Sequence, residues 1–150
     1  FTSGGYKSVK FRNVNSDGSA AQTTGFVDTD FPLFRAADAY LMLAECAARG
    51  AADNAKGLAA YNAVRERAGV PTASSITPED VLNERGRELL WEGHRRSDLI
   101  RFGQFTTADY LWEYKGSVKE GVAVADYRNL FPLPPADVNA NSNLKQNAGY

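Results

Sequence analysis

The sequence predicts an all-α fold: a helix hairpin plus a third long helix, with long irregular loops. Two segments with helical apolar spacing, residues 30–50 and 53–68, are separated by only a few residues, which is typical of antiparallel helices. A strong helix start at Thr77 opens a third helical pattern that runs to Phe102. From residue 104 onward the chain is rich in aromatic residues and proline and shows no helical period, which predicts loops.

The length of 150 residues suits one domain, which we divide into an irregular lead-in (1–30), a helical core (31–103) and a loop-rich tail (104–150). The net charge of −1 gives no reason to expect nucleic acid or an anionic membrane as a partner. No transmembrane run and no signal peptide is evident. Because the chain begins with Phe1 rather than Met, we expect a processed product or a piece of a longer protein.

The lead-in is polar and predicts a short strand at Tyr6–Phe11 and a turn at Asn15–Gly18. The first helix is expected to begin at Asp30 as N-cap, with an early proline, and to end at Gly50. It is apolar around most of its circumference, which indicates packing on more than one side. We therefore expect its single cysteine, Cys46, to be buried and inert.

The second helix, 53–68, presents an apolar face bordered by Arg65 and is ended by Gly69. The third helix has an N-cap at Thr77 followed directly by proline and two acids, and we expect it to continue to Gly103. Two interior glycines, Gly86 and Gly93, weaken such a helix by about 1 kcal/mol each, and close packing of another helix is expected to offset this.

The segment from Glu84 to Gly103 is dense in both signs of charge. On a continuous helix three of its glutamates (84, 88 and 92) and three of its arginines (85, 95 and 96) fall within an arc of about 120° that also holds Val81 and Leu99. This geometry predicts a partly buried ion-pair network, joined by Arg65 of the second helix. Its expected members are Arg65, Glu84, Arg85, Glu88, Glu92, Arg95 and Arg96.

A metal site is the alternative interpretation of the three glutamates, which are spaced four residues apart. A carboxylate metal site of this kind needs a histidine on a partner helix, and the only histidine, His94, follows Glu92 by two residues. Interleaved arginines also repel a cation. We therefore expect no metal, no cofactor and no catalytic residues, since no nucleophile motif accompanies Cys46 and His94.

The loop from Gln104 to Tyr127 is aromatic-rich and free of helical constraint. Trp112 and Tyr114 are the candidate ligand-binding residues, because sugars stack their apolar faces on aromatic rings. The alternative is that these rings fill the space between the loop and the third helix. Solvent exposure distinguishes the two interpretations.

Several motifs resemble those of the SusD/RagB family. They are Arg35–Cys46 (RAADAYLMLAEC), Tyr61–Gly69 (YNAVRERAG), Glu84–Gly103 (ERGRELLWEGHRRSDLIRFG), Phe131–Pro134 (FPLP) and Gln146–Tyr150 (QNAGY), in the family's order. Asp38, Phe102 and Leu133 stand where the family more often has Glu, Trp and Ile, which leaves the chemistry unaltered.

The resemblance implies tetratricopeptide-like helix pairs and a non-catalytic role. Family members are surface lipoproteins of the outer membrane in glycan-using bacteria. They capture oligosaccharide, or peptide in some members, and cap a SusC-like TonB-dependent transporter. The resemblance covers only the family's C-terminal portion, so the lipid-bearing cysteine and the main sugar-stacking residues are expected upstream. Cys46 is not that cysteine.

Two functions of different classes stay open. One is oligosaccharide capture as part of a SusD-like protein. The other is a tetratricopeptide-like scaffold that binds a peptide or protein partner without recognising sugar. The sequence does not identify the ligand.

Overall fold

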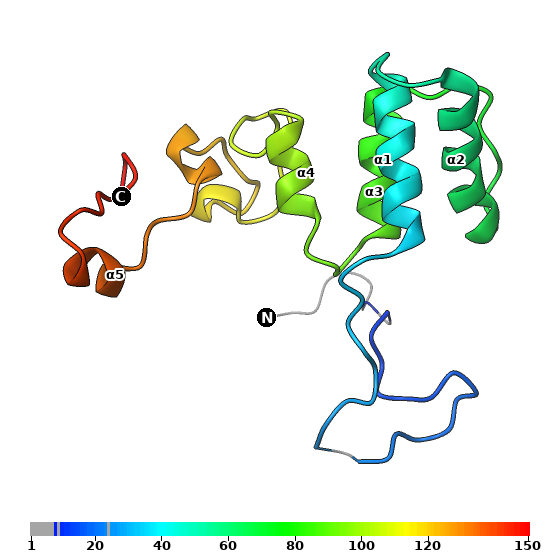
Figure 1. Cartoon of the computed structure of the whole chain (residues 1–150), viewed down its shortest axis with the longest axis horizontal. Coiled ribbons are helices and arrows are strands. Elements are labelled where there is room, and N and C mark those ends of the chain that lie inside the picture. The colour runs from blue at the N-terminus through cyan, green and yellow to red at the C-terminus, as the bar shows by residue number, and fades with distance from the viewer. Residues whose placement is uncertain (1–7, 9, 24) are drawn as a thin grey trace. The chain divides into compact units, whose positions relative to one another are not determined.

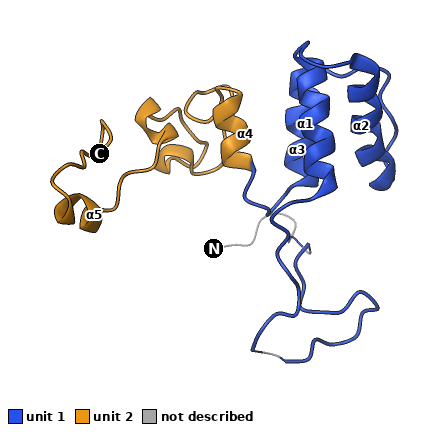
Figure 2. Ribbon diagram, in the orientation of Figure 1, with its two compact units in different colours: residues 1–94 blue, residues 95–150 orange. Residues whose placement is uncertain are grey.

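The computed structural model describes residues 8, 10–23 and 25–150. They divide into two compact units, 1–94 and 95–150 (Figure 2). The described residues are helical, with one isolated β-bridge between Val14 and Ala20 in place of strands, which confirms the all-α class. The turn at Asn15–Gly18 is also confirmed, whereas much of the strand expected at Tyr6–Phe11 lies outside the described residues.

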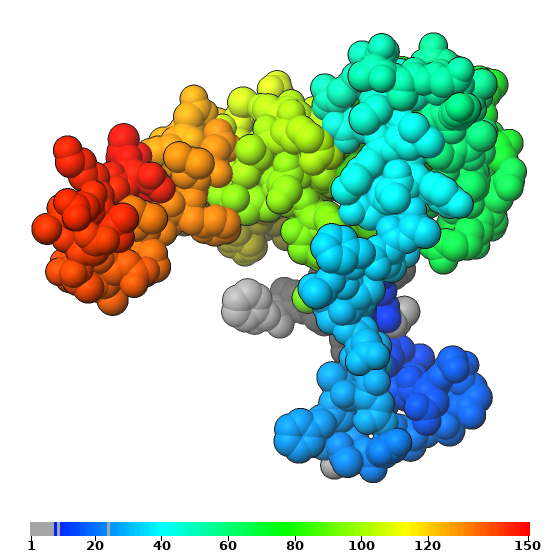
Figure 3. All heavy atoms as spheres, viewed as in Figure 1, coloured from blue at the N-terminus to red at the C-terminus, as the bar shows by residue number. Residues whose placement is uncertain are grey.

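Unit 1 contains α1 (Ala36–Ala48), α2 (Asn54–Arg67) and α3 (Pro78–Glu88) (Figure 1). α1 packs on both α2 and α3, as its nearly all-round apolar character predicts. In the space-filling view the atoms of these helices form one closely packed body (Figure 3). The core of the unit consists of Ala37, Leu41, Ala44, Tyr61, Val64 and Val81.

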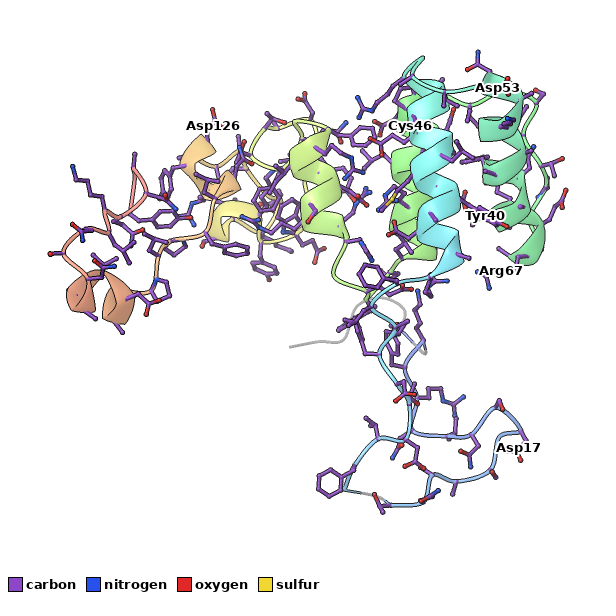
Figure 4. The ribbon with its side chains drawn as sticks, viewed as in Figure 1. Asp17, Tyr40, Cys46, Asp53, Arg67 and Asp126 are labelled. Atoms are coloured by element: carbon purple, nitrogen blue, oxygen red, sulfur yellow. The ribbon has the colours of Figure 1, made fainter. Side chains whose placement is uncertain are left out.

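The α1–α2 contact depends on Gly57. A Cβ at this position would collide with the Cβ of Ala47 and meet the backbone of α1 at 3.5 Å. The expected antiparallel hairpin is therefore closer than ordinary side chains allow. Asp53 and Arg67 mark the two ends of α2 (Figure 4), and the Asp53 carboxylate accepts a 2.8 Å hydrogen bond from the Lys56 N–H.

Two expectations about α1 are wrong. The helix begins after Arg35, which occupies the N-cap in an extended conformation, rather than at Asp30. Arg35 makes no capping bond, since a guanidinium has no acceptor for the helix N–H groups, and it donates instead to Glu88 and Glu92. Cys46 is exposed on α1 rather than buried (Figure 4), since the helix has a solvent-facing side despite its apolar composition.

The predicted long third helix is also wrong, because it ends at Glu88 and a separate helix, α4 (Arg95–Arg101), follows. In a continuous helix the Glu88 carbonyl would accept the Glu92 N–H. Here it accepts hydrogen bonds from Lys10 Nζ (2.7 Å) and Arg35 Nη2 (3.1 Å) instead. Gly93 is exposed and adopts φ 81°, so it serves the turn rather than a helix contact.

The start of α3 matches the sequence pattern. Thr77 and Asp80 form a reciprocal capping box, and Pro78 is the first helical residue. Proline and the two acids that follow therefore identify the start correctly, although they carry no information about where the helix ends.

Unit 2 contains α4, the 3₁₀ segments η1 (Lys115–Ser117) and η2 (Asp126–Asn129), and α5 (Pro135–Ala140). Few of its apolar side chains are fully buried, and polar bonds hold much of the chain. The Gln146 side chain pairs with both the N–H and the carbonyl of Leu133, at 2.8 and 2.9 Å. Among the described residues, no helix is both long and apolar enough to cross a bilayer.

Candidate functional site

The charged residues of unit 1 form what we call the ion-pair cluster. It comprises Lys10, Arg35, Asp38, Arg65, Arg67, Glu84, Arg85, Arg87, Glu88 and Glu92. The cluster connects the lead-in, α1, α2 and α3. Its carboxylates are nearly inaccessible to solvent. Their negative charge is therefore balanced by the neighbouring Arg and Lys side chains rather than by water.

Glu84 confirms the predicted link to the second helix. Its carboxylate lies 2.8 Å from Arg65 Nη1 and 2.6 Å from Arg87 Nη2, and its side chain is 4% exposed. Hydrogen bonding to Glu84 raises the pKa of Arg65, against the opposing effect of burial. The pair keeps α2 and α3 together beside the apolar core.

Arg35 belongs to the ion-pair cluster, although it was not among the members expected from the sequence. It holds Glu92 with a two-pronged contact, Nε to Oε2 and Nη2 to Oε1 at 2.8 Å each, and it reaches Glu88 Oε1 at 2.8 Å. Lys10 also contacts Glu92. Burial acts to raise the pKa of Glu92, but hydrogen bonds from Arg35 and Lys10 outweigh it and hold the pKa below its usual value.

Arg85 and Asp38 form a further buried contact. Arg85 Nη1 lies 2.7 Å from Asp38 Oδ1, and both side chains are largely inaccessible. From the sequence, Arg85 was expected to pair with the glutamates of its own helix. The partner on α1 follows instead from how the helices pack.

Arg95 and Arg96 require a correction. Their predicted place in the network assumed one continuous helix, and they lie beyond its break, on α4 of unit 2. The Arg95 guanidinium lies 4.7 Å from the centre of the Tyr110 ring. Arg96 lies over Phe131 (3.9 Å) and Phe105 (4.9 Å). In unit 2 these cations face aromatic rings.

The ion-pair cluster serves as scaffold. Its glutamates are each engaged by one or more cations, so none is left as an accessible carboxylate ligand or base. In the part of the chain that the structure describes, no three His, Cys, Asp or Glu side chains gather where a metal ion could be held.

The second candidate site is a concave region of unit 2 that we call the aromatic hollow. Its volume is about 280 Å³. It is lined by Arg96, Phe105, Trp112, Lys115, Gly116, Val124, Arg128, Leu130, Phe131 and Tyr150. Aromatic walls with a few polar groups are typical of small-molecule sites.

Trp112, one of the two predicted ligand residues, lines this hollow. Its side chain is 39% exposed, and its ring stacks on Phe105 with centroids 5.8 Å apart. Tyr110 lies tilted at 6.2 Å. The ring therefore packs against Phe105 while part of its surface stays open to solvent. It can stabilise the loop and also contact a ligand.

Lys115 fixes the loop that carries Trp112. Its buried ammonium donates hydrogen bonds to the carbonyls of Thr107 (2.5 Å) and Tyr110 (2.7 Å), and it lies 4.7 Å from the centre of the Trp112 ring. Burial lowers the pKa of Lys115. The backbone also closes tightly here, since a Cβ on Gly121 would lie 2.5 Å from the Trp112 carbonyl oxygen.

Tyr114 has a different setting. It is 62% exposed and adopts a left-handed conformation with φ 65°. It is not among the residues that line the aromatic hollow. The structure therefore brings only one of the two predicted ligand residues to a concave surface. Two arginines of the hollow, Arg96 and Arg128, were not predicted there.

Comparisons with known proteins give one family. The sequence profile of the SusD family matches residues 1–150. The starch-binding protein SusD of Bacteroides thetaiotaomicron is 43% identical over 147 residues, which cover 97% of this chain and 26% of that protein.

Solved structures give the same family. The surface glycan-binding protein A of Bacteroides uniformis superposes with a TM-score of 0.66 at 27% identity, over 79% of this chain and 27% of that one. A laminarin-binding SusD-like protein gives 0.63 at 27% identity, over 92% and 26%. The chain therefore spans about a quarter of the length of these relatives.

Proposed function

The chain belongs to the SusD family, and from this premise we propose that it is part of a protein that captures oligosaccharide without catalysing a reaction. The protein would lie at the outer-membrane surface and deliver its ligand to a SusC-like TonB-dependent transporter. The names of the relatives, which refer to starch, laminarin and glycan, support saccharide over a sugar-free scaffold.

The observation that carries the proposal is the partly exposed Trp112 ring in the wall of the aromatic hollow. Stacking on a sugar ring needs an accessible aromatic face, fixed in orientation before the ligand arrives. Phe105 and Lys115 provide that fixation. Tyr114 is proposed as an accessory contact at the surface.

The test is calorimetric titration of the full-length protein with neutral malto- and laminari-oligosaccharides. Trp112→Ala is expected to weaken binding by about 1–3 kcal/mol with little change in melting temperature. Trp91→Ala is the matched control, because Trp91 is an exposed tryptophan of unit 1 and does not line the hollow. Equal effects of the two variants, or no saccharide binding, would contradict the proposal, as would turnover of the sugars.

A further inference from the structure

We infer that the aromatic hollow binds a saccharide unit that carries an acidic group, a carboxylate or a sulfate, and that Arg128 and Arg96 hold this group. The inference rests on the proposed function and specifies its ligand class. It begins from the charges that line the hollow. Arg96, Lys115 and Arg128 are cationic, and no lining side chain carries a carboxylate.

Most arginines of unit 1 are, by contrast, paired with an acid. Arg35, Arg65, Arg67, Arg85 and Arg87 each lie within 2.8 Å of an Asp or Glu oxygen, whereas the exposed Arg12 of the lead-in pairs with no acid among the described residues. Neither Arg96 nor Arg128 has a carboxylate partner among the residues that the structure describes. Two guanidinium groups in one hollow therefore lack the compensation that most arginines of unit 1 have.

Arg96 is held rigidly with donors to spare. Its guanidinium lies between Phe131 and Phe105, and Nη2 donates to the carbonyls of Arg128 (2.8 Å) and Asn129 (3.1 Å). Within the described part of the chain, Nε and Nη1 have no hydrogen-bond acceptor. A guanidinium with fixed orientation and open N–H groups is suited to an anionic oxygen, because little side-chain freedom is lost on binding.

Arg128 is the accessible cation of the pair. Its side chain is exposed and lies 5.5 Å from the centre of the Tyr127 ring. The nearest acid along the chain, Asp126, accepts a 2.7 Å hydrogen bond from the Thr106 hydroxyl. Its carboxylate thus has a role of its own in joining η2 to the loop.

Lys115 contributes charge but not a ligand contact. Its ammonium is buried and donates to two backbone carbonyls, so it is not free to leave them for a ligand. An acidic sugar could stack its ring on Trp112 while its carboxylate or sulfate faces the guanidinium groups. A neutral sugar would use the ring alone and leave the arginines without an anion.

The experiment uses the full-length protein and matched ligands: a galacturonate trisaccharide, its methyl ester, and a sulfated neutral trisaccharide with its unsulfated form. The charged member of either pair is expected to bind at least about tenfold more tightly at low salt, with the difference reduced as salt increases. The pair that shows this difference identifies the acidic group as carboxylate or sulfate.

Arg128→Gln should remove most of the preference for the charged ligand, so that the charged and the neutral member of a pair bind within about twofold of each other. Lys145→Gln is the control, because it removes an exposed positive charge from the same unit outside the hollow. Arg96→Lys keeps the charge but loses the planar fork, and should also reduce the preference.

Equal binding within both pairs, or a preference that Arg128→Gln leaves intact, would overturn the inference. The proposed function would survive that result if neutral sugars still bound and Trp112→Ala weakened them. Absence of binding to every saccharide would overturn both.

Discussion

The two units use their arginines differently. In unit 1, Arg35, Arg65 and Arg85 are directed at buried carboxylates that connect helices. In unit 2, Arg95 and Arg96 lie over aromatic rings, and Arg96 donates to backbone carbonyls. One charged segment of the sequence supplies both uses. The ring contacts of Arg95 and Arg96 lie beyond the break between α3 and α4, where Arg101 still pairs with the buried Asp98 at 2.8 Å.

This difference between the units indicates which of them can bind a ligand. Unit 1 has a continuous apolar core, and removing one of its buried charges takes a partner away from another. Unit 2 is held by ring contacts, loop hydrogen bonds and the buried Lys115, and it keeps Trp112, Phe131 and Tyr150 partly exposed. A surface of this kind can exchange solvent for a ligand without dismantling the fold.

The largest expected effect is on the unit 1 scaffold. Glu92→Ala should lower the free energy of unfolding by about 3 kcal/mol, the lower end of the range for a broken buried pair, because Arg35 keeps Glu88 as a partner. Chemical denaturation measures this. Lys56→Gln, at an exposed position of α2, should cost less than about 0.5 kcal/mol. A Glu92 variant as stable as the Lys56 variant would refute the scaffold role.

The corresponding change in unit 2 is Lys115→Ala. It removes the donor to the Thr107 and Tyr110 carbonyls, and each acceptor left buried without a partner costs about 1–3 kcal/mol. Because water can reach an opened loop, we expect about 2 kcal/mol and faster amide hydrogen exchange over residues 106–122. Lys119→Ala, at an exposed position of the same loop, is the control. Unchanged exchange would show that the loop does not depend on Lys115.

A helix-packing variant isolates the hydrophobic part of unit 1. Gly57→Ala should destabilise the protein by about 1–2 kcal/mol, since overpacking costs about 1–3 kcal/mol and better helix propensity returns up to about 1 kcal/mol. Gly25→Ala has no atom within 4 Å of the new methyl group and should leave the melting temperature unchanged. If both variants melt like the unaltered protein, the α1–α2 contact is looser than the structure indicates.

The smallest effect concerns pH. The pKa of Glu92 lies below its usual 4.5 in the folded chain, so its ionised form contributes stability that is fully present above pH 4.5 and is lost as the pH falls through the folded value. Stability followed from pH 6 to pH 3 should therefore fall less steeply in Glu92→Gln, which cannot titrate. Identical slopes would contradict the assigned pKa direction.

The parts of the candidate site that could be predicted from the sequence are those that follow from the chemistry of a single side chain. Trp112 was expected to contact a ligand because sugars stack on aromatic rings, with packing of the loop as the alternative; it lines the hollow, and its contact with a ligand stays a prediction. The Arg65–Glu84 link was expected because a cation at the border of an apolar face needs a partner. Arg96 and Arg128 were not assigned to the hollow. Their place depends on the chain from Phe131 to Tyr150 meeting the loop, a contact between residues far apart in sequence.

By itself the sequence determined the helical class, the N-cap at Thr77, the start of α2 and the family, because local hydrogen bonds and characteristic residue spacings encode them. Only the tertiary structure decided where the third helix ends. Lys10 and Arg35, from distant segments, take the Glu88 carbonyl that would have continued it. The spacing of apolar residues indicates which helix the backbone can form locally. The end of this helix depends on the Lys10 and Arg35 donors, which only tertiary packing brings to the Glu88 carbonyl.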